Sequence, residues 1–199
     1  MVGPIRFSIM TYNVHSCIGN DGKNLPMRIA KIIAGMRPDI VALQELDVGL
    51  TRTGCVDQAE LIACELGMYF QFHPSLCIQD GRYGNAILSR YPIRPVKAGG
   101  LPSRRKEPRR GALWVEIDLK GHSIQVINTH LGLTPVRRRT QSQMLMGPEW
   151  LGNEKCKAPT ILCGDMNATQ GSYVYHNFSQ KLTDAQMLLP VRTRKRHTW

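Results

Sequence analysis

The sequence has no hydrophobic run long enough to cross a bilayer, and this absence sets a first limit on what the chain does. Its longest apolar stretches, such as Ile40–Leu43 and Ala158–Cys163, are only a few residues long, whereas a transmembrane helix needs about 20. The opening MVGPIRFSIMTY has neither the apolar stretch nor the small-residue cleavage site of a signal peptide. We therefore expect a soluble, cytoplasmic protein.

Several motifs that carry well-known chemistry are also missing. None of the 6 cysteines stands in a CxxC pair, which argues against a zinc ribbon or a thioredoxin-type site. Cys64 and Cys163 lie within apolar patterns, so we expect both to be small, buried, reduced side chains. No GxSxG, Walker or GxGxxG sequence opens a helix, so a hydrolase elbow, a P-loop and a dinucleotide site lack support.

Acidic residues are scarce, with 15 Asp and Glu against 26 Lys and Arg, which leaves a formal net charge of +11. Hydrophobic residues make up 42% and charged residues 21% of the 199 positions, close to the average of globular proteins. A disordered or collagen-like chain is thereby excluded. The length suits a single domain over residues 1–199, large enough to bury a core of its own.

The positive charge is confined to the second half of the chain. Residues 1–89 have a balance of −1, whereas residues 90–199 have a balance of +12, concentrated in three clusters at 104–110, 137–139 and 192–196. Such clusters attract polyanions, so nucleic acid and an anionic membrane surface are candidate partners. A solvated surface that only maintains solubility explains the same clusters equally well.

Strand-like and helix-like segments alternate along the chain. Helical spacing of apolar residues predicts helices over 28–36, 56–66 and 136–151, the last interrupted near Gly147–Pro148. Lys120–Gly121 separates two strand-like segments and predicts a hairpin. The expected strands cover 5–12, 39–43, 68–72, 85–90, 112–118, 122–128 and 160–163. This mixture predicts an α/β (α+β) domain built on mixed sheets.

Five polar residues follow directly after apolar strands, where a rigid scaffold holds side chains at an open rim. They are Asn13, Glu45, His130, Asp165 and Asn167. A lone Asp or Glu at such a place is usually a turn residue or a helix cap, and a lone His is usually a solvent or core residue, but five polar residues together point to a site. Two carboxylates with amides and an imidazole favour a hard cation such as Mg²⁺ or Mn²⁺. Metal-assisted hydrolysis of a phosphate ester fits this set best.

Six segments give the sequence a family resemblance. In chain order they are TYNVH (11–15), DIVALQEL (39–46), YGNAILSRYPI (83–93), RRGALWVEI (109–117), INTHLG (127–132) and GDMNA (164–168). Together they resemble the endonuclease/exonuclease/phosphatase superfamily of metal-dependent phosphoesterases. The resemblance implies a four-layered α/β/β/α sandwich, with two packed mixed sheets flanked by helices. It also implies Mg²⁺-dependent cleavage of a phosphodiester or a phosphomonoester.

The resemblance assigns a role to each of the five strand-end residues. Glu45 matches the main metal ligand of the family, and Asn13 matches the amide beside it. Asp165 matches the carboxylate that orients or deprotonates the attacking water, and Asn167 matches an amide that holds substrate and metal. His130 matches the histidine that hydrogen-bonds a phosphate oxygen as charge builds up.

Two further positions carry softer assignments from the same resemblance. Asn85 and Arg110 stand where family members often place phosphate-contacting groups. Arg110 is equally well explained as solvated surface charge, and the neighbouring Tyr83 as a packing aromatic.

The sequence departs from the family at its C-terminal end. Family members close with a strand that carries an Asp-His pair, an acid–base unit, and residues 169–199 contain no such dipeptide. His197 has no adjacent Asp and does not replace it. We therefore expect a C-terminally incomplete domain, which is either part of a longer protein or naturally shortened.

The substrate stays open between a nucleic acid and a phospholipid head group, with a phosphodiester favoured over a monoester. The alternative function is a non-catalytic module that binds anions or nucleic acid and retains the fold without the terminal acid–base pair. The sequence is silent on oligomeric state.

Overall fold

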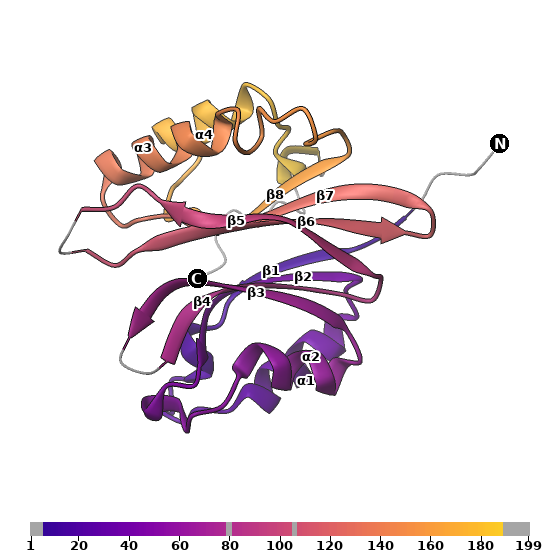
Figure 1. The fold of residues 1–199 in the computed structure, drawn as a ribbon, viewed down its shortest axis with the longest axis vertical. Coiled ribbons are helices and arrows are strands. Elements are labelled where there is room, and N and C mark those ends of the chain that lie inside the picture. The colour runs from indigo at the N-terminus through magenta and orange to yellow at the C-terminus, as the bar shows by residue number, and fades with distance from the viewer. Residues whose placement is uncertain (1–5, 79–80, 105–106, 189–199) are drawn as a thin grey trace.

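Two four-stranded sheets lie face to face, and helices cover both outer faces (Figure 1). The computed structural model describes residues 6–78, 81–104 and 107–188. The four-layered sandwich implied by the resemblance is confirmed. Of the three basic clusters, residues 105–106 of the first and the whole of the third, 192–196, lie outside the described residues. Among the described residues, no helix has the length and apolar character needed to span a membrane.

The first sheet comes from the first half of the chain and has the strand order β1-β2-β4-β3. Its strands are β1 (Ile9–Asn13), β2 (Ile40–Val48), β3 (Tyr69–Ile78) and β4 (Gly81–Ser89). β1 runs parallel to β2, and the other pairs are antiparallel. The helices of this half are α1 (Pro26–Met36) and α2 (Gln58–Leu66), with two short 3₁₀ turns, η1 (His15–Cys17) and η2 (Thr51–Thr53).

The second sheet has the order β5-β6-β7-β8 and repeats this mixture of directions. Its strands are β5 (Ile93–Leu101), β6 (Arg110–Leu119), β7 (His122–His130) and β8 (Thr160–Asp165). β7 is parallel to β8, and the expected hairpin joins β6 to β7. The outer layer contains α3 (Pro135–Met146) and α4 (Tyr173–Ser179), followed by the 3₁₀ turn η3 (Ala185–Leu188).

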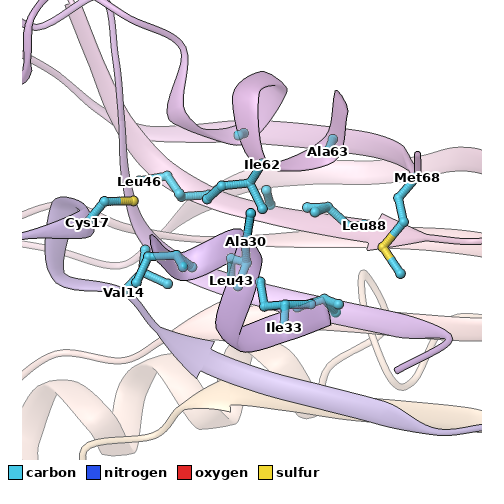
Figure 2. Packing of buried hydrophobic residues seen from close by; sticks show 14 residues of the cluster. Val14, Cys17, Ala30, Ile33, Leu43, Leu46, Ile62, Ala63, Met68 and Leu88 are labelled. Carbon is cyan, nitrogen blue, oxygen red and sulfur yellow. The ribbon is translucent and has the colours of Figure 1, made fainter. Parts of the chain in front are cut away.

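Three apolar clusters hold the four layers together. One lies between the sheets and contains Ile40, Ile87, Leu113, Val115, Ile117, Ile124 and Val126. A second joins the second sheet to α3 and α4. A third joins the first sheet to α1 and α2, where Ile33 and Ile62 meet Leu43 and Leu88 (Figure 2). β2 is buried on both faces, which explains why its first part, Ile40–Leu43, is an unbroken apolar run rather than an alternating one.

The parallel pairs bring several strand ends to one end of the sandwich. Asn13 ends β1, His130 ends β7 and Asp165 ends β8. β1 also lies against β8 of the opposite sheet. Because parallel strands finish at the same edge, these three side chains gather although they are far apart in the sequence.

β2 differs from the expected strand in one respect that matters for the site. The sequence analysis ended this strand at Leu43 and placed Glu45 after it, which is wrong, because β2 continues to Val48. Its register against β4 shifts between Leu43 and Leu46, as in a β-bulge. The extra residue in the bulge lets the strand continue while Glu45 takes an independent direction.

Other boundaries also differ from the sequence-based expectation. β4 begins at Gly81 rather than at residue 85, so Gly81 and Gly84 lie within the strand. At Gly84 a Cβ would lie 2.0 Å from the His73 carbonyl oxygen, so glycine here allows close strand contact. β5 and α4 were not predicted, and α3 ends at Met146 rather than at residue 151. Cys64 is exposed on α2 and Cys163 is partly buried, so the burial predicted for Cys64 is wrong.

A buried amide connects the two sheets immediately behind the bulge. Asn128 of β7 is fully buried, and its Nδ2 donates to the backbone oxygens of Leu43 (2.8 Å) and Ala86 (2.9 Å) in the first sheet. Its Oδ1 accepts a hydrogen bond from Nε2 of Gln44 at 2.8 Å. These three bonds satisfy polar groups that lie next to the bulge.

We predict that Asn128→Leu destabilises the fold, because it leaves two strand carbonyls and the Gln44 amide without these partners. The free energy of unfolding should fall by about 3 kcal/mol, since each buried unsatisfied group costs about 1–3 kcal/mol. Urea denaturation measures this loss. Lys31→Ala, at an exposed position of α1, is the matched control. An equal effect of both substitutions would contradict the structural role of Asn128.

Candidate active site

Asn13, Glu45 and Asp165 form the centre of the cluster at this end of the sandwich. Nδ2 of Asn13 donates to Oε1 of Glu45 at 2.9 Å and to Oδ2 of Asp165 at 3.0 Å. The Glu45 and Asp165 side chains are 17% and 31% exposed, so water reaches both carboxylates. One amide thus holds two carboxylates, one from each sheet, close together at an accessible edge.

The backbone around these side chains is held in unusual conformations. Glu45 has a φ of 63°, in the left-handed region that side chains other than glycine rarely adopt. Gly164 has a φ of 135°, and a Cβ there would lie 1.9 Å from the Thr129 carbonyl oxygen. Only glycine fits, and it brings Asp165 directly beside the end of β7. Backbone strain of this kind concentrates at functional sites.

His130 lies behind the two carboxylates and is surrounded by hydrogen-bonding groups. Nη1 of Arg110 is 3.1 Å from its Nδ1, and Nδ2 of Asn167 is 3.0 Å from its Nε2. Longer contacts join Nδ1 to Oε1 of Glu45 (3.7 Å) and Nε2 to Oδ2 of Asp165 (3.8 Å). The imidazole is therefore in contact with two donors and within reach of two carboxylates.

This environment disfavours the protonated form of His130. Burial lowers the pKa of the imidazole, and the positive charge of Arg110 lowers it further, against the opposing effect of Asp165 and Glu45. Arg110 always donates, and an imidazolium has no nitrogen left to accept. His130 is accordingly a neutral group that is oriented by Arg110.

Asn167 is held at the same place by a local turn. Its backbone N–H donates to Oδ1 of Asp165 at 2.9 Å, and its Nδ2 donates to the Leu131 carbonyl oxygen at 2.9 Å. Its φ of 46° is again left-handed, a conformation that asparagine tolerates better than most residues. All five strand-end residues singled out in the sequence are thus brought together, although their individual roles stay predictions.

The two softer assignments occupy different positions. Arg110 is buried at the start of β6 and directly contacts His130. Asn85 is also buried, and its amide donates to the Gly111 carbonyl oxygen at 3.2 Å. Thr129 donates to the same oxygen at 3.1 Å. The Asn85 amide therefore holds the backbone next to Arg110, and its contact with phosphate stays a prediction.

Two side chains that sequence reasoning did not select also belong to the cluster. Nδ1 of the exposed His15 lies 3.3 Å from Oε2 of Glu45. Tyr83 lies close to Glu45 and Arg110. Burial and the Glu45 carboxylate raise the pKa of its hydroxyl, while Arg110 opposes that rise. Both residues lie inside the segments that carry the family resemblance. Their position in these segments was the sequence signal that could have identified them as site residues.

A buried carboxylate that pairs with an exposed arginine supports the turn that carries His15. Asp47 is fully buried and accepts two hydrogen bonds from Arg52, both at 2.8 Å. It also accepts from the hydroxyls of Ser16 (3.1 Å) and Thr53 (3.2 Å). Because a buried carboxylate needs such partners, this network connects η1 and η2 to β2 close to Glu45.

The site offers oxygen donors that can be compared with the needs of Mg²⁺. Among the residues that the structure describes, no group of three or more His, Cys, Asp and Glu side chains is arranged to hold an ion. Mg²⁺ does not require such a group, because proteins commonly bind it through one or two carboxylates and leave its other positions to water and phosphate. Glu45 and Asp165 are two accessible carboxylates of this kind, so the residues fit Mg²⁺.

Comparisons with known proteins place this arrangement in a family. The Escherichia coli protein YbhP is 26% identical over 171 residues, which cover 81% of this chain and 66% of YbhP. A crystal structure of an endonuclease/exonuclease/phosphatase protein from Beutenbergia cavernae is 25% identical, with a TM-score of 0.67, over 82% of this chain and 48% of that chain. This chain thus spans just under two thirds of YbhP and about half of the bacterial structure.

A human protein has the same fold. The catalytic domain of human Nocturnin, solved with a bound sulfate anion, is 20% identical with a TM-score of 0.71, over 97% of this chain and 76% of that domain. The model of the endonuclease/exonuclease/phosphatase family matches residues 10–199. The chain therefore belongs to the endonuclease/exonuclease/phosphatase family.

Proposed function

We propose that this chain is a Mg²⁺-dependent hydrolase that cleaves a phosphate ester, with a phosphodiester favoured over a monoester. The observation that carries the proposal is the convergence of Asn13, Glu45, His130, Asp165 and Asn167 at one accessible edge. They come from the ends of β1, β7 and β8, the bulge of β2 and the turn after β8. Family membership supports a hydrolase of this class.

Glu45 is proposed as the principal metal ligand, with Asn13 beside it. When bound, Mg²⁺ supplies Lewis-acid polarisation of a phosphoryl oxygen. The Asn13 amide holds the carboxylates of Glu45 and Asp165 close together despite their like charge. Mn²⁺ would use the same oxygen ligands.

Asp165 is proposed to orient the attacking water and to accept its proton. Its Oδ1 is occupied by the Asn167 backbone N–H, and its Oδ2 by the Asn13 amide, so the carboxylate has a fixed direction. His130 is neutral and is proposed to donate one hydrogen bond to a phosphate oxygen. Arg110 donates to Nδ1, so the ring hydrogen is on Nε2, which is the atom proposed to donate.

The charge distribution supports a phosphate-bearing substrate. The half of the chain with a balance of +12 supplies His130, Asp165 and Arg110, and a positive balance of this size attracts anions. Both nucleic acids and anionic lipid head groups present a phosphodiester to such a surface. A screen of nicked and abasic DNA, RNA, phosphoinositides and sphingomyelin separates these substrates.

The second candidate function is a non-catalytic anion-binding module. It is favoured by the surplus of basic residues, +12 over residues 90–199, because such a charge attracts anions whether or not the site hydrolyses them. Running the substrate screen with Mg²⁺ and with EDTA decides between the two functions. Mg²⁺-stimulated turnover supports the hydrolase, whereas salt-sensitive binding without turnover supports the module.

We predict that Asp165→Asn lowers kcat at least about 100-fold, because an amide cannot accept the proton of the attacking water. Glu45→Gln should raise the Mg²⁺ concentration needed for half-maximal activity at least about tenfold, because a neutral ligand holds the ion less well. Steady-state kinetics over a Mg²⁺ series measures both effects. Glu65→Gln, exposed on α2, is the control. Activity equal to wild type in both site variants would refute these roles.

A separate prediction concerns the buried guanidinium of Arg110. Arg110→Gln should reduce kcat/KM about tenfold to 100-fold, because it removes a charge-assisted hydrogen bond to His130, a type worth about 1.5–3 kcal/mol. The matched control is Arg94→Gln, whose side chain is 71% exposed and pairs with Glu116. An equal loss in the two variants would show that general positive charge, and not the contact with His130, is responsible.

A further inference from the structure

A cavity of about 260 Å³ adjoins the cluster on the side of the first sheet. It lies between the end of β1, η1 and α1, and it is lined in part by Asn13 and His15. Both residues contact Glu45, through Asn13 Nδ2 at 2.9 Å and His15 Nδ1 at 3.3 Å. A group bound in the cavity would therefore lie next to the proposed metal ligand.

The wall formed by η1 is held in a strained conformation. His15, Ser16 and Cys17 have φ values of 49°, 50° and 58°, three left-handed residues in succession. The Ser16 carbonyl oxygen accepts hydrogen bonds from Asn24 (2.5 Å) and Gln58 (2.7 Å). Such a turn persists only where the surrounding structure enforces it, and here it leaves the His15 side chain 80% exposed beside the cavity.

The buried side of this turn is anchored in the core. Val14 and Cys17 belong to the apolar cluster of the first sheet, α1 and α2 (Figure 2), and both also line the cavity. This side of the turn is therefore fixed by packing against the core.

The lining combines apolar surface with hydrogen-bonding groups. Ile18, Ile29 and Ile32 supply the apolar surface, and Asn20 with His15 supplies polar groups. Arg28 also lines the cavity, but Asp21 accepts hydrogen bonds from both of its terminal nitrogens, at 2.9 and 3.1 Å. The positive charge of Arg28 is thereby balanced, so the cavity is suited to an uncharged group.

The opposite side of the cluster has the contrasting chemistry. Arg110 contacts His130 there, and a broad hollow of about 640 Å³ along the end of β5 is lined by Arg104 and Arg109. A phosphate ester in the site is thus drawn by its charge toward the arginines. The uncharged alcohol portion of the ester would then face the isoleucine-lined cavity.

We propose that this cavity binds the alcohol portion of the phosphate ester, and that this portion is a compact, uncharged, hydroxyl-bearing ring. The inference rests on the proposed hydrolase function. The cavity is smaller than the about 300–1,000 Å³ of sites for drug-sized ligands, so it takes one ring rather than an acyl chain or several nucleotides. A cyclic polyol and a nucleoside share this chemistry.

Binding is tested without any turnover by NMR of isoleucine methyl groups. Titration with myo-inositol and, separately, with uridine at millimolar concentrations should shift the Ile18 and Ile32 signals. The Ile117 signal should not move, because this side chain is buried between the sheets. The ring that gives the larger shift identifies the source of the alcohol. Absence of shifts with both rings would overturn the proposal.

A matched pair of variants on α1 tests the same site by kinetics. Ile32→Trp fills the cavity, whereas Met36→Trp adds the same ring at a 72% exposed position that does not line it. Ile32→Trp should abolish the methyl shifts of Ile18 and raise KM at least tenfold for a phosphodiester of the ring. It should leave KM unchanged for the phosphodiester in which a methyl group replaces the ring. Met36→Trp should change neither the methyl shifts nor the KM for the ring-bearing substrate.

The outcomes distinguish the subsite from the hydrolase function. Methyl shifts that Ile32→Trp removes, without any hydrolysis by the wild type, would support the cavity as a binding site and reject the hydrolase. Hydrolysis of the ring-bearing phosphodiester with the same KM in wild type and Ile32→Trp would reject the subsite but would still support the hydrolase function. Equal effects of the two tryptophan variants would also overturn the subsite.

Discussion

The site depends on one constraint, which is that β2 must stay buried on both faces and still deliver a carboxylate to the edge of the sandwich. A regular strand would alternate its side chains between the two apolar layers. The shift in register between Leu43 and Leu46 resolves this conflict by giving Glu45 a left-handed backbone and its own direction. Asn128 then satisfies the polar backbone beside the bulge from the opposite sheet.

The same end of the sandwich combines two electrostatic environments. On the side of the second sheet, Arg110 is buried against His130 and lowers the pKa of the imidazole. On the side of the first sheet, Arg28 is balanced by Asp21, and the cavity beside Asn13 is lined by both isoleucine and polar side chains. An electrostatic difference of this kind orients a substrate that has one charged and one uncharged part, because each part is stabilised on a different side.

Much of the architecture was predictable from local sequence patterns. Apolar periodicity located α1, α2, most strands and the hairpin at Lys120–Gly121, because each depends on neighbours in the chain. The regions that escaped prediction have weak local signals. β5 is partly exposed and contains Pro95 and two glycines, and α4 has only 7 residues. Cys64 follows the helical pattern of α2 but faces solvent, since one turn of a helix has both a buried and an exposed side.

By itself, the sequence determined the residue types of the site and their order, because six motifs in succession identify the family and its layered sandwich. The tertiary structure decided which side chains meet. Asn13 and Asp165 are separated by 152 positions and lie 3.0 Å apart because parallel strands of two packed sheets end at one edge. The bulge at Glu45, the contact of His15 with that carboxylate and the cavity beside it also arise only from packing. No local pattern encodes them, since each depends on the register between distant strands.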